Sequence, residues 1–521
     1  MTLNTENVTI MESPKGTAVH ALLNQTQLTR VQKFYDAKHI MITGATGFVG
    51  KILIEKLLRS CPGVEKLYLL VRQKKGKDVF ERIDQVFQEP IFDRLKEQQP
   101  KFRHKVMVVS ADFEQPGLGL AVTDRQMLIG KINIIFHGAA TVKFDEHLRK
   151  AININVRGPL NLLKLAREMK NLDVLMHVST AFSNCHLSHV EEKFYTFDDD
   201  CQKLFEIIDK LSLQEIEDLL PGILKGWPNT YTFTKALAEK ELRANASGIP
   251  IAIFRPAIVV STYKEPISSW LDNTYGPTGV TIGFGTGVLR VLHCNPEVSA
   301  DLVPVDSLVN CLVVAAERVH ATYKMRPPPP DPPIFNYVSS PDNRITWGQY
   351  IIKSIDSFEQ YPMLNAVWYP TFTLTKYALL YNIYDFFLHV APAAFLDVLM
   401  LCAGKKPKIL KIYKKVHKMC AVVVYFLTHQ ITFCNKNTQE LWSFTSDGDK
   451  EIFPFNMQDL NWDEYLDSYL VGIRRYLCNE TDDMLCQAKI KRRRLYYLHQ
   501  IMKIILCTLF VFTLWSSFNL W

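Results

Sequence analysis

Tyr231 and Lys235 are the two residues whose types and spacing most directly suggest chemistry. They lie four residues apart in NTYTFTKALAEK (residues 229–240), so a helix would carry both side chains on one face. A phenol with a pKa of about 10 is a poor proton donor at neutral pH, but an ammonium one turn away stabilises the phenolate. Chance alone gives roughly one such pair in a chain of this composition. An ordinary surface helix is therefore the alternative, and the pair needs support from other residues.

A hydroxyl that could assist Tyr231 stands at the end of the predicted strand DVLMHVST (residues 173–180). Ligands bind at the carboxyl ends of strands in open parallel sheets. A hydroxyl at that edge can donate to an oxyanion that develops beside the phenol. Both Ser179 and Thr180 fit by sequence, and we favour Thr180. We therefore predict a catalytic set of Thr180, Tyr231 and Lys235.

A glycine turn follows the first predicted strand, HIMITG (residues 39–44), and leads into the amphipathic KILIEKLLRS. In TGATGFVG, Gly44 allows the tight turn, Gly47 lets the backbone approach a pyrophosphate, and Gly50 lets the helix pack closely on the strand. The helix N-terminus supplies amide hydrogens and the positive end of its dipole for phosphates. The sequence thus predicts a dinucleotide site that includes Thr43, Gly44, Gly47, Phe48, Val49 and Gly50. A turn of purely structural function is the alternative.

The residues after the second predicted strand favour NADPH over NADH. Where an NAD-dependent enzyme places an acidic residue for the ribose hydroxyls, this chain has LLVRQKKGK, with Arg72, Lys74 and Lys75. Basic side chains suit a 2′-phosphate, although a solvated basic loop would have the same composition. The other cofactor-binding residues that we expect stand at the ends of the later strands: Asp112, Ala139, Ala140 and Pro256.

Six short apolar runs alternate with longer amphipathic ones and predict a doubly wound parallel sheet, a Rossmann-like α/β fold, over residues 38–325. A polar tail (1–37) without a secretory signal precedes it. The Pro-rich MRPPPPDPP begins a connecting segment (326–362), and an apolar, mainly helical second domain follows (363–480). The eleven cysteines lack paired spacing, which favours reduced thiols over disulfides or a metal site.

The net charge of +7 comes from two local runs of basic residues. Seven lysines lie between 405 and 418, and five basic residues lie between 489 and 494; without these twelve the chain has more acidic than basic residues, which argues against a nucleic-acid-binding surface. The second run precedes an apolar stretch that predicts a transmembrane anchor (497–521) with the main body in the cytosol. A buried C-terminal helix is the alternative. For the apolar segments beside the lysines, 377–404 and 420–434, we expect an interfacial hairpin or a lipid-lined pocket rather than a second span.

Together, the glycine turn, the strand-end hydroxyls and the Tyr-Lys pair resemble the extended short-chain dehydrogenase/reductase superfamily. Within it, residues 36–475 are similar to the alcohol-forming fatty acyl-CoA reductases of animals. The more specific matches are FHGAATVKFDE, VSTAFSN, VEEKFY and FRPAIVVSTYKEPISSWLDNTYGPTG. One departure is the serine before Trp270, where many relatives have glycine, and it bears on the substrate loop rather than on the chemistry.

The resemblance implies a two-step reduction of a long-chain acyl-CoA with release of CoA. NADPH would reduce the thioester to an aldehyde and then to a primary alcohol, a precursor of ether lipids and waxes. Thr180 and Tyr231 would polarise the carbonyl oxygen, while Lys235 holds the phenol and the nicotinamide ribose. The protein would be anchored in the endoplasmic reticulum, peroxisome or lipid droplet membrane.

Two alternative functions compete with this one. Another membrane-bound extended reductase, acting on sterol or sugar-nucleotide substrates, would share the glycine turn and the Tyr-Lys pair but not the block from Trp270 to Pro277. A catalytically silent scaffold that binds lipid or nucleotide at the membrane would share the fold. Consumption of NADPH with a long-chain acyl-CoA separates the enzyme from the scaffold.

Overall fold

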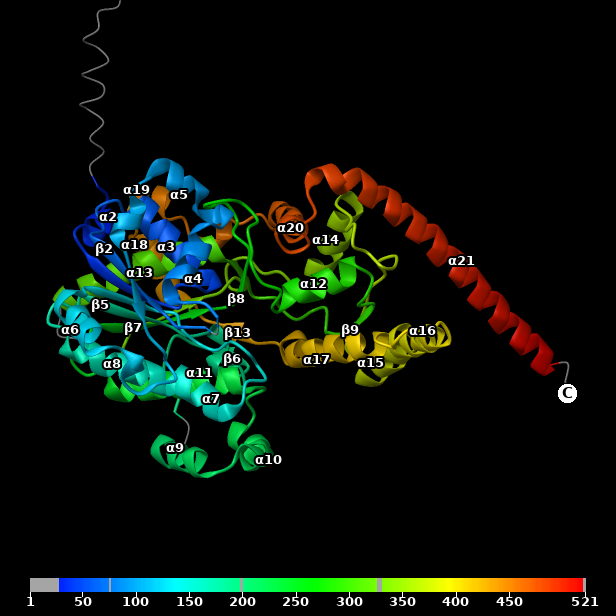
Figure 1. Cartoon of the computed structure of the whole chain (residues 1–521), viewed down its shortest axis with the longest axis horizontal. Helices are drawn as coiled ribbons and strands as arrows, with labels where there is room; N and C mark the ends of the chain where they lie inside the picture. The colour runs from blue at the N-terminus through cyan, green and yellow to red at the C-terminus, as the bar shows by residue number, and fades with distance from the viewer. Residues whose placement is uncertain (1–27, 75, 197–199, 326–329, 519–521) are drawn as a thin grey trace, which may run out of the picture.

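The computed structural model describes residues 28–74, 76–196, 200–325 and 330–518 (Figure 1). The first described element is a short helix, α2 (Arg30–Tyr35), which packs into the core through Val31 and Tyr35. The Tyr35 hydroxyl donates to the Val313 carbonyl at 2.8 Å. Residues 28–37 therefore belong to the folded body, unlike the polar tail that the sequence predicts up to residue 37. Lys75, a predicted cofactor residue, lies outside the described residues.

A seven-stranded parallel sheet forms the centre of the molecule, with the order β11-β7-β5-β4-β1-β2-β3. Its strands are β1 (His39–Thr43), β2 (Lys66–Val71), β3 (Val106–Ser110), β4 (Ile134–His137), β5 (Val174–Val178), β7 (Ile251–Pro256) and β11 (Ile334–Tyr337). The order reverses direction between β1 and β4, and such a switch point opens a crevice at the carboxyl ends of the strands. This confirms the doubly wound, Rossmann-like sheet that the alternating apolar runs predict.

Helices cover both faces of the sheet (Figure 1). On one face α3 (Phe48–Ser60) packs against α13 (Val305–Met325), and on the other α8 (Gly158–Glu168) packs against α11 (Thr230–Asn245). The shorter helices of this half are α4 (Val79–Phe87), α5 (Asp93–Gln98), α6 (Val122–Lys131), α7 (Leu148–Ile152), α9 (Cys201–Lys210) and α10 (Leu213–Leu224). Because both faces are covered, the strands are apolar along nearly their whole length.

The sheet continues past the Pro-rich segment. β11 follows it directly and pairs with β7, so the fold does not end at residue 325, where the sequence predicts the end of the first domain. The chain returns again with α18 (Lys436–Phe444) and α19 (Asp447–Ile452), and α18 contacts both β11 and α13. Tyr337 donates to the Phe455 carbonyl at 2.9 Å. A strand of four residues leaves too short a pattern to be recognised in the sequence.

A helical region extends from the carboxyl edge of the sheet. It contains α12 (Pro277–Gly285), α14 (Trp347–Gln360), α17 (Ile409–Thr428) and α20 (Trp462–Gly472), with two-residue or three-residue strands β6 (His189–Val190), β8 (Ile258–Val260), β9 (Val291–His293), β10 (Leu302–Pro304), β12 (Thr373–Thr375) and β13 (Thr432–Phe433). In this region α14 packs along α20. β13 pairs with β6 and thereby ties the end of α17 back to the reductase half.

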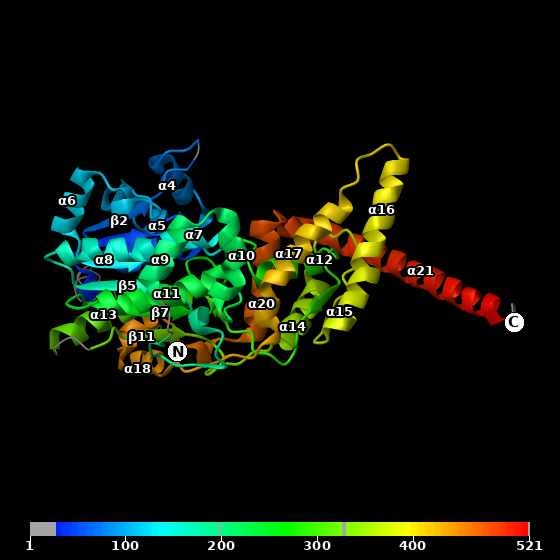
Figure 2. The same cartoon turned by 90° about the horizontal axis from the view of Figure 1, so that it is seen from below.

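Two long apolar helices are exposed in this region. One is continuous from Ala378 to Cys402, composed of α15 (Ala378–Asp385), a π-turn (Phe386–Val390) and α16 (Ala391–Cys402). Pro392 does not interrupt it because this proline follows the π-turn, in the first turn of α16. The other is α21 (Leu485–Phe518), which projects from the body (Figures 1 and 2). Both helices are long and apolar enough to cross a bilayer.

Candidate active site

The Tyr-Lys pair lies at the start of α11. The helix is capped by Asn229, whose side chain accepts a hydrogen bond from the Thr232 amide at 2.9 Å. This cap sets the register of the first turns, so that Tyr231 and Lys235 share the face toward β5. Lys235 is 3 % exposed, and its Nζ donates to the Val178 carbonyl, the last of β5, at 2.8 Å. Helix and strand are thus joined at the catalytic lysine that the sequence predicts.

The structure gives different partners to the two candidate hydroxyls. Ser179 Oγ donates to the Glu239 carboxylate at 2.5 Å. Glu239 is buried and also accepts hydrogen bonds from the fully buried Arg255, from Nη2 at 2.6 Å and from Nε at 3.0 and 3.2 Å. Thr180 hydrogen-bonds with the Tyr231 phenol and makes only a long contact, 3.5 Å, with the Pro256 carbonyl. Ser179 is therefore engaged in a structural ion-pair network, while Thr180 faces the phenol.

Burial shifts the pKa values of Tyr231 and Lys235 in opposite directions. It raises the pKa of the Tyr231 phenol to about 12, with the Thr180 hydrogen bond opposing the rise. It lowers the pKa of Lys235 to about 8, with the negative charge of Glu239 opposing the fall. In both cases the neutral form is favoured because a charge loses its hydration in the interior. At neutral pH the phenol therefore carries the proton that a general acid must donate, and the lysine is still mostly charged.

The glycine turn has the close contacts that its predicted use requires. Gly44 has φ +76°, and a Cβ there would lie 2.8 Å from the Gly138 carbonyl carbon. A Cβ on Gly50 would lie 2.2 Å from the Gly44 carbonyl oxygen. Only glycine fits at either position, and the turn leaves backbone amides at the start of α3 for an anion. This cradle fits a dinucleotide pyrophosphate.

Other residues of the turn have structural partners. The Thr43 hydroxyl lies 2.7 Å from His137 Nδ1 and accepts from the Ala139 amide at 3.1 Å, which ties the ends of β1 and β4 together. The Phe48 ring stacks on Trp270, 5.5 Å between centroids. Val49 is half-buried and packs against the apolar core. These three side chains shape the crevice, so the three residues would contact a cofactor through their backbone atoms.

A second arginine, which sequence reasoning missed, lies beside Arg72. Arg72 directly follows β2, with a side chain that is 52 % exposed, and it pairs with Glu114 at 2.7 Å. Arg82, in α4, donates to the Arg72 carbonyl and to Thr46 Oγ1 in the glycine turn, the latter at 3.0 Å. Burial and the positive charge of Arg72 lower the pKa of Arg82. No spacing rule links a helix residue to a strand end ten positions earlier, so only the packing of α4 reveals this pair.

The remaining predicted cofactor residues lie along the same edge of the sheet. Asp112 follows β3, and its carboxylate accepts from the Glu114 amide at 3.1 Å. Ala139 and Ala140 are half-buried directly after β4, and Pro256 ends β7. Sequence reasoning also missed Asn155 in a π-turn, whose amide donates to the Thr141 carbonyl at 3.1 Å and to the Thr234 hydroxyl at 3.0 Å. Asn155 thereby fixes the loop after β4 against α11.

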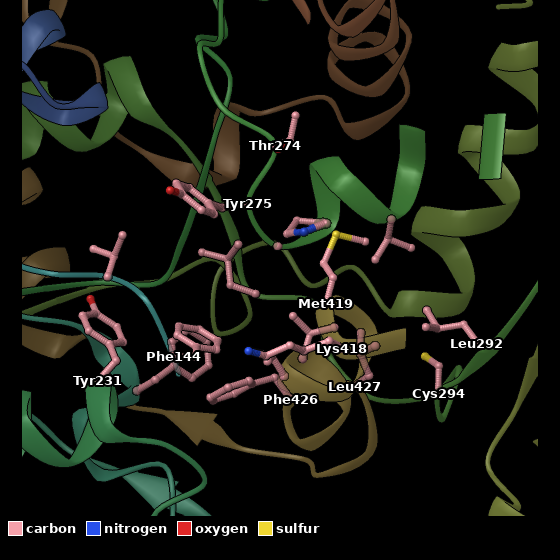
Figure 3. Close-up of a pocket in the computed structure, with 18 of the residues that line it drawn as sticks. Phe144, Tyr231, Thr274, Tyr275, Leu292, Cys294, Lys418, Met419, Phe426 and Leu427 are labelled. Atoms are coloured by element: carbon pink, nitrogen blue, oxygen red, sulfur yellow. The ribbon is translucent and has the colours of Figure 1, made fainter. Parts of the chain in front are cut away.

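A cavity of about 460 Å³ begins at Tyr231 and runs along α17 (Figure 3). Phe144 stacks on the Tyr231 ring with centroids 5.7 Å apart. The walls are mostly apolar and come from several elements: Phe182, Ile258, Val280, Leu292, Trp347, Ile351, Met419, Val422, Val423, Phe426 and Leu427. Exposed lysines, Lys143, Lys415 and Lys418, stand at its open side. A cavity with mostly apolar walls and the Tyr231 phenol at one end suits an apolar chain with a single reactive polar group.

Comparisons with known proteins agree with these features. Residues 42–312 match one family model and residues 388–480 another, both described as male sterility protein. The chain is 42 % identical to "Fatty acyl-CoA reductase wat" of Drosophila melanogaster over 469 residues, 90 % of each chain. It is 35 % identical to "Fatty acyl-CoA reductase 1" of Homo sapiens over 498 residues, 95 % of this chain and 96 % of that one.

Solved structures share the fold at low sequence identity. The terminal R domain of the myxalamid PKS-NRPS pathway superimposes with a TM-score of 0.56 at 18 % identity, over 84 % of this chain and 91 % of that one. The R domain of a nonribosomal peptide synthetase from Mycobacterium tuberculosis gives 0.54 at 16 % identity, over 87 % and 97 %. Identity this low bears on architecture alone, whereas the similarity to the curated relatives extends over nearly the whole chain. The chain belongs to the fatty acyl-CoA reductases, a family of oxidoreductases.

Proposed function

We propose that this protein reduces a long-chain fatty acyl-CoA to the primary alcohol with NADPH and releases CoA. The observation that carries the proposal is the apolar cavity whose polar end is the Tyr231 phenol. An acyl chain in this cavity would place its thioester carbonyl beside Tyr231 and Thr180. A highly polar sugar nucleotide does not account for an apolar cavity along α17, and membership of this family favours an acyl-CoA over a sterol.

The residues of the site would act on one oxygen atom in two successive reductions. The bound nicotinamide supplies hydride to the carbonyl carbon. In the first reduction, the hydroxyls of Tyr231 and Thr180 donate to the carbonyl oxygen and stabilise its developing charge. Tyr231 protonates that oxygen to give the tetrahedral hemithioacetal, which then collapses: its hydroxyl proton passes to sulfur, the C–S bond breaks, CoA leaves as the thiol and an aldehyde remains. In the second reduction, Tyr231 gives its proton to the alkoxide oxygen, and the Lys235 ammonium stabilises the phenolate.

Arg72 and Arg82 support the choice of NADPH. Their guanidinium groups lie near the end of β2, which is where the adenosine ribose lies in doubly wound folds. Two arginines at this place, with Glu114 already paired to Arg72, favour a 2′-phosphate over a free hydroxyl. Lys235 would hold the nicotinamide ribose at the opposite end of the crevice.

The C-terminal helix α21 would anchor the enzyme in a membrane. All its described side chains from Ile501 to Trp515 are exposed, and they are apolar except for Lys503, Thr508 and Thr513 and the weakly polar Cys507. The basic run Lys489–Arg494 precedes them and would remain on the cytosolic side, together with the catalytic half. The membrane would be that of the endoplasmic reticulum, the peroxisome or the lipid droplet.

The stoichiometry of the reaction tests the proposed function. Purified full-length protein, with a long-chain acyl-CoA, is expected to oxidise two NADPH for each CoA released and to form the fatty alcohol. One NADPH for each CoA, with aldehyde as the product, would contradict the second reduction. Binding of NADPH without consumption, at every acyl chain length, would favour the catalytically silent scaffold instead.

A further inference from the structure

The long helix Ala378–Cys402 exposes an apolar surface for which the described part of the chain offers no cover. Its large side chains are well exposed, among them Leu379 (74 %), Phe387 (66 %) and Phe395 (63 %). Phe386, Val398 and Leu401 are each more than half exposed as well. Over 25 residues only a few side chains turn inward, including His389, Ala393 and Asp397. An apolar surface of this extent marks an interaction site rather than ordinary solvent exposure.

Polar contacts hold this helix firmly against α17. Asp397 accepts hydrogen bonds from the amides of Lys408, Ile409 and Leu410 at 2.8 to 3.0 Å and so caps the start of α17. His389 Nε2 accepts from the Arg290 amide at 2.9 Å, so Nδ1 carries the proton and donates to Asp385 at 2.8 Å. The same carboxylate lies 2.8 Å from His417 on α17. Because His389 uses both ring nitrogens in hydrogen bonds, this cluster is a structural clamp between the two helices rather than a metal site.

The lysines beside this surface give it a positive border. Seven lysines lie between residues 405 and 418, all exposed, and no acidic residue occurs between Asp397 and Glu440. Among the described residues, only Lys418 of the seven has a carboxylate partner, Asp145 at 2.7 Å. An apolar surface bordered by unpaired lysines is complementary to a bilayer with anionic headgroups.

The direction of the helix relative to α21 indicates how it would meet a bilayer. In Figure 2, α21 runs lengthwise away from the body, while α15 and α16 run across that direction; in Figure 1 the same pair is foreshortened beside α21. If α21 crosses the membrane, the helix 378–402 lies roughly in the plane of the membrane. The lysines at the turn after Cys402 also argue against insertion of the hairpin tip into hydrocarbon, because buried ammonium groups are costly there.

We propose that helix 378–402 and the lysine run 405–418 form a second membrane contact, which lies flat in the headgroup region of an anionic bilayer. This hairpin surface adjoins the cavity, since Lys415 and Lys418 belong both to the lysine run and to the open side of the cavity. The contact would present the open side to the membrane, so that an acyl chain passes between bilayer and cavity without crossing water. This last step rests on the proposed function, whereas the membrane contact does not.

Photochemical labelling of the full-length protein in anionic vesicles tests the contact. One phospholipid probe carries its diazirine next to the glycerol, and a second carries it at the end of an acyl chain. We expect the first probe to label peptides from 378–402 along their whole length, while the second labels α21 only. Labelling of 378–402 by the second probe would mean a membrane span, and labelling of α21 alone would mean no contact; either result overturns the proposal. Crosslinks between 378–402 of two copies of the chain would overturn it in favour of a dimer.

Matched variants make the test specific. Phe387→Asp should reduce labelling of 378–402 several-fold, whereas Phe80→Asp, at a phenylalanine of similar exposure (61 %) on α4, should not. The triple variant Lys405→Gln, Lys406→Gln and Lys408→Gln should also reduce labelling of 378–402 in anionic vesicles. Its control is a triple variant at exposed lysines elsewhere: Lys101→Gln, Lys131→Gln and Lys170→Gln. Equal labelling of all variants would overturn the proposal. Labelling of α21 serves as the internal standard for insertion and folding.

Kinetics of Phe387→Asp separate this proposal from the proposed function. The variant should turn over a vesicle-bound long-chain acyl-CoA several-fold more slowly, but reduce a short, water-soluble aldehyde at the normal rate. An equal loss for both substrates would overturn the access step. If the wild-type protein reduces neither substrate, the proposed function fails, while the labelling experiment still decides the membrane contact.

Discussion

The carboxyl edge of the sheet and the helical region beyond it differ in the side chains that form them and in the function that those side chains suit. At the sheet edge, groups such as Lys235, Ser179 and Thr43 are buried and have defined hydrogen-bond partners. In the helical region, apolar side chains line a cavity and others face outward, while directional contacts such as those of Asp385 and Asp397 join one helix to the next. Directional bonds fix atoms for proton transfer, whereas apolar packing accommodates a chain whose methylene groups are all alike.

The comparison predicts that the largest loss of activity comes from a single atom at the sheet edge. Tyr231→Phe should lower the rate of alcohol formation by about 10²- to 10⁴-fold, because the general acid is lost. NADPH binding, measured by fluorescence titration, should remain nearly unchanged. Tyr361→Phe is the control for removal of a hydroxyl elsewhere. Loss of the folded state in Tyr231→Phe, seen by circular dichroism, would mean that the phenol is structural.

A smaller loss is expected from the arginines at the end of β2. Arg82→Ala should raise the KM for NADPH by about tenfold or more, since one charge-assisted contact to the 2′-phosphate would disappear. The KM for NADH should change little, so the ratio of the two KM values is the measurement. Arg103→Ala is a matched control, because Arg103 also contacts α4, through Asp84 at 2.8 Å. An equal rise of both KM values would mean that Arg82 supports the glycine turn through Thr46 and not the phosphate.

A change in the helical region should alter which substrate is used rather than the chemistry. Val423→Trp fills part of the cavity that α17 lines, so acyl-CoAs with long chains should lose more kcat/KM than those with short chains. Competition between chain lengths in one mixture, followed by analysis of the alcohols, measures the shift. A uniform loss at every length would show that this wall does not face the acyl chain.

Removal of the Thr180 hydroxyl should lower activity, whereas removal of the neighbouring Ser179 hydroxyl should lower stability. Thr180→Ala should lower kcat by roughly tenfold or more, because one donor to the oxyanion is lost. Ser179→Ala should leave kcat near normal but lower the free energy of unfolding by about 1–2 kcal/mol, since Glu239 loses a buried hydrogen bond. Rates and denaturation of both variants are to be compared. The reverse pattern would assign the catalytic role to Ser179.

The smallest expected effect is a pH dependence set by Lys235. With its pKa lowered to about 8, the ammonium is present below that pH and is lost as the pH rises through it. The profile of kcat/KM should therefore fall above about pH 8. As the pH rises from about 8 to about 10.4, the free energy of unfolding should increase, because in this range the unfolded chain binds the proton of this lysine and the folded chain does not. A fall in activity that coincides with loss of stability would point to unfolding instead.

The sequence by itself determined the elements whose signals are local. The glycine turn, six of the seven strands of the sheet and the Tyr-Lys spacing are each encoded within a few consecutive residues, and the structure has the turn, the strands and the helix at those places. The long apolar helices are likewise visible as runs of composition. Such features can be predicted because periodicity and turn chemistry depend on neighbours in the chain.

Tertiary structure decided what depends on contacts between distant segments. It alone distinguishes Ser179, which bonds Glu239, from Thr180, which faces Tyr231. It brings Arg82 to the glycine turn, adds β11 to the sheet after the Pro-rich segment, and turns the helix 378–402 across the direction of α21. Packing sets the partners of a side chain, and residues that are close in the fold leave no fixed spacing in the sequence.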